Sequence, residues 1–195
     1  MTGLWDGNKM TLINSEYQKQ LNRMHADGKF NNGIKAYRIV EQFFKDHQPT
    51  SVMDFGCGIG ALIAGVKELH PEIVSEGYDP GNPEFARLPN RTFDAVVSTD
   101  ALEHVEPAYL DDTLRMISDK MERCGFFRIA CYPAKKKLPD GRNAHLIVEL
   151  PEWWRVKIET VMGVKIVWEE ISVFDKSSKW DWVTGHNYDV VVEVK

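Results

Sequence analysis

The chain has 195 residues, a formal net charge of −5 and 43% hydrophobic residues. This length predicts one domain, or one domain with a small extension, large enough to bury a core without disulfide or metal support. The acidic balance argues against general binding to nucleic acid or to an anionic membrane surface. The longest apolar runs are too short to span a bilayer, and the N-terminus lacks the blocks of a signal peptide. Cysteines without paired spacing are typical of a reduced, cytoplasmic protein, and here they are Cys57, Cys124 and Cys131.

In chain order, apolar periodicity predicts helices at 14–27, 34–47, 61–69, 107–123 and 151–162. It predicts strands at 52–55, 73–79, 93–98, 125–133, 164–174 and 186–194. This alternation predicts an α/β fold, with a Rossmann-like, mostly parallel sheet and helices on both faces. The last two strands have no helix between them, so we expect them to form an antiparallel C-terminal pair. We further expect residues 1–47 to form an N-terminal helical cap and residues 48–195 the Rossmann-like domain.

A glycine-rich turn, "DFGCGIG" at residues 54–60, follows the first predicted strand. Glycine at Gly56, Gly58 and Gly60 permits positive φ and a close approach of backbone N–H groups to a ligand. With Ala61 the turn also fits the dinucleotide pattern G-x-G-x-x-[GA], so the turn alone leaves a dinucleotide or another nucleoside open. Asp54, at the strand end, places a carboxylate that suits a ligand amine and sits poorly beside a pyrophosphate.

An acid followed by G-x-G-x-G resembles the first motif of class I S-adenosylmethionine-dependent methyltransferases. Their second motif, an acid that binds the ribose hydroxyls, is matched by Asp79 in "EGYDP", and "FDAVV" at 93–97 resembles their fourth strand. More narrowly, the chain is similar to a compact group of bacterial and phage methyltransferases. The resemblance implies S-adenosylmethionine as cofactor. The cofactor-binding residues that we predict are Asp54, Gly56, Cys57, Gly58, Gly60, Asp79, Pro80 and Asp100.

The chain departs from the family after Asp79. Only residues 80–92 precede Phe93, whereas the family usually has a further helix and strand there. This segment is too short for both, so we expect that strand to be missing. The acid that usually contacts adenine from its end is then missing too, and we expect Phe85 or Leu88 to pack on the adenine ring instead.

The absence of two sequence motifs limits the kinds of acceptor that we expect. The chain lacks the [DNS]-P-P-[YFW] motif of base-amino methylation and the Pro-Cys nucleophile of cytosine carbon methylation. We therefore expect O-methylation of a small-molecule, sugar or nucleotide-linked hydroxyl. The alternatives are a nicotinamide-dependent oxidoreductase and a non-catalytic S-adenosylmethionine-binding protein.

The polar loop "AKKKLPDGRNAHLI" follows the predicted strand 125–133, at the strand end where open α/β sheets bind ligands. Arg142 and Asn143 are candidate acceptor ligands, and His145 is a candidate general base. Trp153 in "EWW" is a candidate wall of the acceptor site. The N-terminal segment "YQKQLNRMH" at 17–25 is expected to cover the cofactor, as similar helices do in the family.

A second polar group, "DALEH" at 100–104, follows the predicted strand 93–98. It is similar to the Glu-x-x-Glu-His pattern of metal-dependent small-RNA 2′-O-methyltransferases and of ubiquinone-pathway O-methyltransferases. That resemblance implies a Mg²⁺, Mn²⁺ or Zn²⁺ site formed by Asp100, Glu103, His104 and His145. The metal-free alternative uses Glu103 to shape the acceptor pocket and His104 or His145 as the base.

Overall fold

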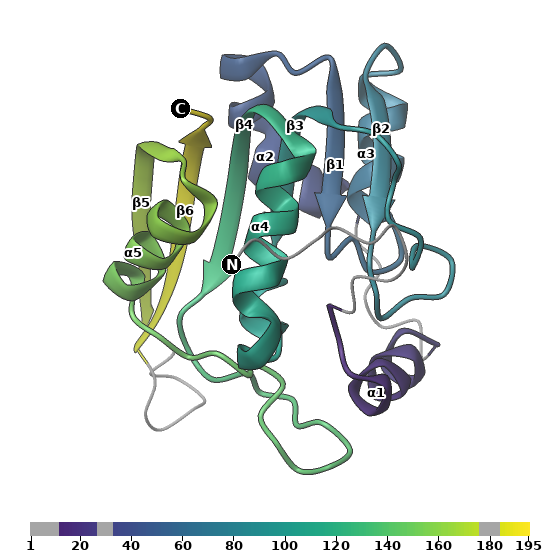
Figure 1. Ribbon diagram of the computed structural model, residues 1–195, viewed down its shortest axis with the longest axis vertical. Coiled ribbons are helices and arrows are strands. Elements are labelled where there is room, and N and C mark those ends of the chain that lie inside the picture. Colours follow the sequence, from purple (N-terminus) through teal and green to yellow (C-terminus); the bar gives the residue numbers. More distant parts are fainter. Residues whose placement is uncertain (1–11, 27–32, 176–183) are drawn as a thin grey trace, which may run out of the picture.

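The computed structural model describes residues 12–26, 33–175 and 184–195. At its centre is a six-stranded sheet in the order β2-β1-β3-β4-β6-β5 (Figure 1). The first four strands are parallel: β1 (Ser51–Phe55), β2 (Val74–Tyr78), β3 (Phe93–Thr99) and β4 (Met121–Ala130). Two antiparallel strands complete the sheet: β5 (Lys165–Asp175) and β6 (Thr184–Glu193). The predicted α/β fold with an antiparallel C-terminal pair is confirmed.

Helices cover both faces of the sheet (Figure 1). On one face lie α2 (Gly33–His47) and α3 (Ala61–Leu69), and on the other α4 (Leu110–Lys120) and α5 (Pro151–Met162). Strand residues alternate between the two faces, so each face carries its own apolar cluster. Val190 and Val192 of β6 pack toward α4 and α5, while Val191 packs toward α2.

The segment between β2 and β3 contains no strand and no helix, as expected from its length. The strand β2 is therefore an edge of the sheet.

One boundary prediction was wrong. A 3-10 turn, η1 (Leu102–His104), precedes the predicted helix 107–123, which begins as a second 3-10 turn, η2 (Pro107–Tyr109), and continues as α4 only to Lys120. The following strand, predicted to begin at residue 125, begins at Met121. Charged side chains at the start of this strand resemble a helix end in sequence, but Arg123 is held extended by its pair with Asp94 on β3.

The helix α1 (Ser15–Ala26) stands apart from the sheet, beyond the carboxyl ends of the parallel strands (Figure 1). Asn14 caps it, because its Oδ1 accepts a hydrogen bond from the Tyr17 N–H at 2.8 Å. The helix α2, by contrast, packs on the sheet through Tyr37, Val40, Phe43 and Phe44. Residues 1–11 and 27–32 of the predicted cap lie outside the described residues, and the division at residue 47 stays a prediction. No described helix is both long and apolar enough to cross a membrane.

Candidate active site

A cavity of about 700 Å³ opens at the carboxyl ends of the parallel strands. Its walls come from the glycine turn after β1, from Asp79 and Pro80 after β2, from the segment after β3, and from α1. This volume lies in the range of small-molecule and cofactor sites, and the position is where open α/β sheets bind ligands. The predicted ligand edge of the sheet therefore carries a cavity.

The glycine turn is tight in a way that only glycine allows. Gly56, Gly58 and Gly60 have φ values of 73°, 56° and 76°, in the left-handed region. A Cβ on Gly56 would lie 2.3 Å from the Cβ of Ala101, in the segment after β3. A Cβ on Gly60 would lie 2.5 Å from the ring of Phe85. The turn thus brings bare backbone to the cavity.

A matched pair of substitutions tests this packing. Gly163→Ala places a side chain at φ 68° with no heavy atom near the new Cβ, so we expect a cost of roughly 1–2 kcal/mol of unfolding free energy. Gly56→Ala incurs the same backbone cost and also pushes against Ala101, so we expect a larger loss in urea unfolding, together with weaker binding of S-adenosylhomocysteine. Equal losses in the two variants would show that the contact with Ala101 is unimportant.

Two of the predicted cofactor-binding acids face the cavity next to this turn. The Asp79 carboxylate accepts hydrogen bonds from the N–H of Gly58 at 2.8 Å and of Gly81 at 2.7 Å. Asp54 is almost fully buried, and burial, followed by the charge of Asp79, raises its pKa well above the usual value. A cationic ligand group beside Asp54 would offset that cost of burying the carboxylate. Cys57 is a further buried residue of the same wall.

Neither residue expected to pack on adenine lines the cavity. Phe85 packs against Gly60, and Leu88 is partly buried against the main apolar core. The apolar lining includes Leu12, Ile13, Leu21 and Val105, and the contact of Phe85 or Leu88 with adenine stays a prediction.

The chain reverses direction immediately after β3. Asp100 adopts φ 53°, in the left-handed region that Asp tolerates better than most residues, and η1 follows. This reversal buries Glu103 and turns His104 toward the cavity. The ring of His104 is oriented by its Nδ1, which lies 2.7 Å from the carbonyl oxygen of Ala144 and donates to it.

Glu103, His104 and His145 converge, although His145 is 41 positions beyond His104 in the chain. One potential ligand atom from each residue lies within 4.8 Å of the other two. The Nδ1 of His145 donates to the carbonyl oxygen of Tyr132 at 2.5 Å, and its Nε2 lies 4.0 Å from a carboxylate oxygen of Glu103. Among the described residues, neither oxygen of Glu103 has a hydrogen-bond partner, and burial raises the pKa of this carboxyl group well above its usual value.

Asp100 is not a member of this group, so the predicted four-residue metal set is corrected to three. Its backbone turns in the left-handed region, and its side chain lies among the residues that line the cavity, where burial raises its pKa. Of the three converging residues only His104 lines the cavity, while Glu103 is fully buried and His145 nearly so.

The predicted acceptor ligands in the polar loop have other partners. Asn143 accepts from the N–H of Ala134 and donates to its carbonyl oxygen, both at 2.9 Å, so its amide holds the loop together. Arg142 pairs with Asp140 and lies over the ring of Tyr17. Their contact with an acceptor stays a prediction.

Trp153, predicted to form a wall of the acceptor site, is not among the residues that line the cavity, and its contact with an acceptor stays a prediction. It lies on the outer surface of α5, with 37% of its surface exposed. The neighbouring Trp154 is fully buried in the core, and the α-helical spacing turns the two rings to different sides.

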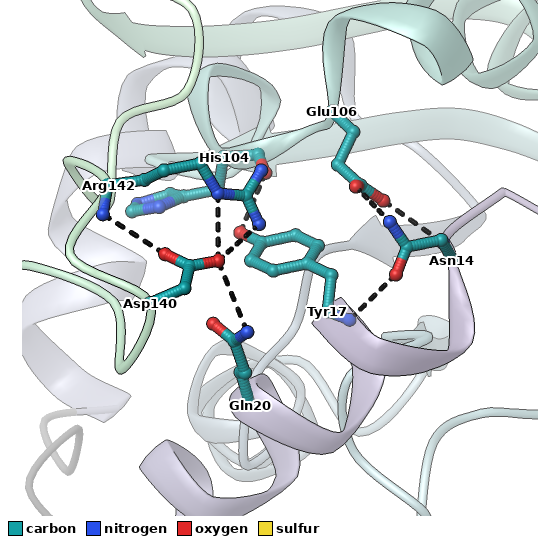
Figure 2. A network of polar contacts seen from close by, with 7 residues as sticks. All are labelled: Asn14, Tyr17, Gln20, His104, Glu106, Asp140 and Arg142. Atoms are coloured by element: carbon teal, nitrogen blue, oxygen red, sulfur yellow. Dashed lines mark hydrogen bonds and ion pairs between the residues drawn. The ribbon is translucent and has the colours of Figure 1, made fainter.

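The segment predicted to cover the cofactor lines one side of the cavity. Figure 2 shows the polar contacts that this segment makes with the rest of the chain. The Tyr17 hydroxyl donates to the His104 carbonyl oxygen at 2.8 Å, and the side chain and N–H of Asn14 donate to the Glu106 carboxylate. Gln20 donates to Asp140 of the polar loop at 3.2 Å. These bonds fasten α1 to both polar segments. Sequence reasoning did not single out Glu106, because no local motif surrounds it.

The fold and this cavity define a class I S-adenosylmethionine-dependent methyltransferase. Residues 28–157 match a family model described as "Methyltransferase domain", and this match covers more than half of the chain. The chain belongs to that family, which sets aside the oxidoreductase alternative. A comparison with curated proteins finds no match.

Solved structures share the fold at low sequence identity. An S-adenosylmethionine-dependent methyltransferase from Archaeoglobus fulgidus is 17% identical, with a TM-score of 0.56 over 84% of this chain and 95% of that chain. The 1,6-didemethyltoxoflavin-N1-methyltransferase of Burkholderia thailandensis is 15% identical, with a TM-score of 0.63 over 96% and 93%. The magnesium protoporphyrin IX methyltransferase of Synechocystis is 15% identical, with a TM-score of 0.57 over 93% and 95%. The latter two contain bound S-adenosylhomocysteine.

Proposed function

We propose that this methyltransferase methylates a hydroxyl group of a small-molecule, sugar or nucleotide-linked acceptor. The observation that carries the proposal is the position of His104, an imidazole that lines the cavity with its Nδ1 bonded to the Ala144 carbonyl. Because Nδ1 holds the proton of the neutral ring, Nε2 has the lone pair that a general base needs.

The cofactor residues follow from the same geometry. S-adenosylmethionine supplies a methyl group on a positively charged sulfur. We assign the binding of its ribose hydroxyls to Asp79 and the binding of its amino group to Asp54 and Asp100. We expect the cofactor to lie close to the backbone of Gly56 and Gly58. Three cavity carboxylates suit a ligand that carries both a sulfonium and an ammonium.

The chemistry at the acceptor requires a proton acceptor. With S-adenosylmethionine bound as the methyl donor, Nε2 of His104 would accept the proton that the acceptor hydroxyl loses when it takes the methyl group. The second imidazole, His145, lies edge-on to the first, with ring centroids 4.8 Å apart. It limits the orientations that the His104 ring can adopt. On this side of the cavity, α1 contributes the buried side chain of Tyr17, which would limit the access of water.

A divalent ion in the same cluster is a second candidate form of the site. The observation that favours it is the buried carboxylate of Glu103, which has no hydrogen-bond partner in the part of the chain that the structure describes. It lies beside two imidazoles that each donate from Nδ1 to a backbone carbonyl. Ligating histidines commonly make that second bond. Two imidazoles and one carboxylate suit Mn²⁺ or Zn²⁺ better than Mg²⁺. A bound ion would lower the pKa of the acceptor hydroxyl.

The acceptor assignment has a direct test. The protein is incubated with S-adenosylmethionine and a fractionated cell extract, S-adenosylhomocysteine is measured, and the product is identified by its gain of one methyl group. Tandem mass spectrometry and NMR then show which atom is methylated. A methyl group on nitrogen or carbon would overturn the proposal while leaving the methyltransferase class intact.

The ion is tested separately. If the cluster holds an ion, dialysis against a chelator should abolish turnover, and Mn²⁺ or Zn²⁺ should restore it more effectively than Mg²⁺. Metal analysis of the untreated protein should then find one ion per chain, and Glu103→Gln should lose it. Full activity in the presence of chelator would show that the reaction needs no ion, and His104 would remain the candidate base.

A further inference from the structure

The cavity contains one strongly basic side chain that has no role in the proposed methyl transfer. Among the described residues that line the cavity, Asp54, Asp79, Asp100 and Glu106 are acids, and Arg128 is the sole lysine or arginine. A cation that lines a ligand cavity, at the carboxyl half of a parallel strand, is well placed to meet an anionic ligand group.

The guanidinium of Arg128 is fixed from one edge. Its Nε donates to Oδ1 of Asp189 at 2.7 Å, and its Nη2 donates to Oδ2 of the same residue. Asp189 lies opposite Arg128 on the neighbouring strand β6 and is 4% exposed, so this pair is built into the sheet. A bidentate bond to a buried carboxylate removes most of the rotational freedom of the arginine.

The other edge of the guanidinium has unused donors. Arginine has five N–H groups, of which the pair with Asp189 uses two. The structure shows no hydrogen bond from Nη1 to any described residue, although Asp100 is close enough to affect the electrostatics of Arg128. The side chain is half-buried and keeps 23% of its surface exposed where it lines the cavity. A planar guanidinium edge fixed in this way matches a second carboxylate.

The charges around Arg128 indicate which kind of anionic group it can bind. Asp189 already neutralises much of the Arg128 charge, and four further acids line the cavity. A phosphate with two negative charges would be repelled, whereas a carboxylate with one charge accompanied by an ammonium would be accepted.

We propose that Arg128, held by Asp189, binds the carboxylate of the methionine part of S-adenosylmethionine. The ammonium of the same amino-acid group would then lie toward Asp100, which follows Thr99, the residue paired with Arg128 in the sheet. This proposal rests on the S-adenosylmethionine dependence of the family and not on the proposed hydroxyl acceptor, so the two can fail separately.

The test compares S-adenosylmethionine with its decarboxylated form, which keeps the sulfonium and the ammonium. In calorimetry, Arg128→Gln should weaken S-adenosylmethionine binding by at least about tenfold, as expected for a lost bond between charged groups. The affinity for the decarboxylated form should be the same in the wild type and in Arg128→Gln. The matched control is Arg123→Gln, because Arg123 lies on the same strand and makes the same two-point bond to Asp94, away from the cavity. It should bind both ligands normally.

Arg128→Gln leaves the buried Asp189 without its partner, which can destabilise the fold. The double variant Arg128→Gln/Asp189→Asn removes both charges and should show the same selective loss. Unchanged S-adenosylmethionine binding in the double variant would overturn the proposal and leave Arg128 a structural partner of Asp189. An equal loss for both ligands would overturn it as well.

Discussion

His104→Asn is expected to lower turnover by about 100-fold or more, the usual contribution of a general base, and to leave S-adenosylhomocysteine affinity unchanged. Asparagine retains a side-chain amide that can donate to the Ala144 carbonyl, but it has no group able to accept the acceptor proton. The measurement is single-turnover kinetics with the acceptor found in extract, beside calorimetry for S-adenosylhomocysteine. The reaction should therefore slow while the cofactor site stays intact.

The control is His47→Asn, a histidine at the end of α2 that does not line the cavity. Its turnover should match that of the wild type. If His104→Asn also retains full turnover, His104 does not accept the proton, and the hydroxyl assignment loses its main support. The cofactor and the family assignment would be unaffected, because neither depends on this residue.

Local sequence patterns were sufficient to predict the strand ends and the residues that come directly after them. Asp54, Gly56 and Gly58 are contiguous with β1, and Asp79 follows β2 directly. Parallel strands in one sheet place their carboxyl ends together, so these residues converge wherever the chain folds as α/β. The missing strand was predictable for a similar reason, since chain length alone limits the elements that residues 80–92 can form.

Features that depend on distant partners were not predictable. The Tyr17 hydroxyl meets the backbone of His104, 87 positions away, and Arg128 meets Asp189, 61 positions away. Neither pair leaves a periodic signal in the sequence. Asn143 has the residue type expected of an acceptor ligand, but it hydrogen-bonds to the backbone of its own loop. The residue type alone therefore favoured a ligand-binding role for Asn143, whereas in the structure its side chain stabilises the loop.

Asp79→Ala is expected to weaken S-adenosylhomocysteine binding by about 1.5–3 kcal/mol, or roughly 10- to 150-fold, the range for a lost hydrogen bond to a charged group. Two effects contribute in the same direction. The variant loses the carboxylate assigned to the ribose, and it frees the N–H groups of Gly58 and Gly81 that now hold the turn in place.

Asp94→Ala separates binding from a general loss of stability. Asp94 is also a carboxylate that accepts a backbone N–H, from Thr50 at 2.9 Å, but it pairs with Arg123 at the start of β3 and does not line the cavity. Both variants should lower the urea midpoint, because both remove bonds that hold backbone segments together. Only Asp79→Ala should change the calorimetric affinity. If the two variants bind S-adenosylhomocysteine equally well, Asp79 serves the turn alone and the ribose hydroxyls must be bound by another group.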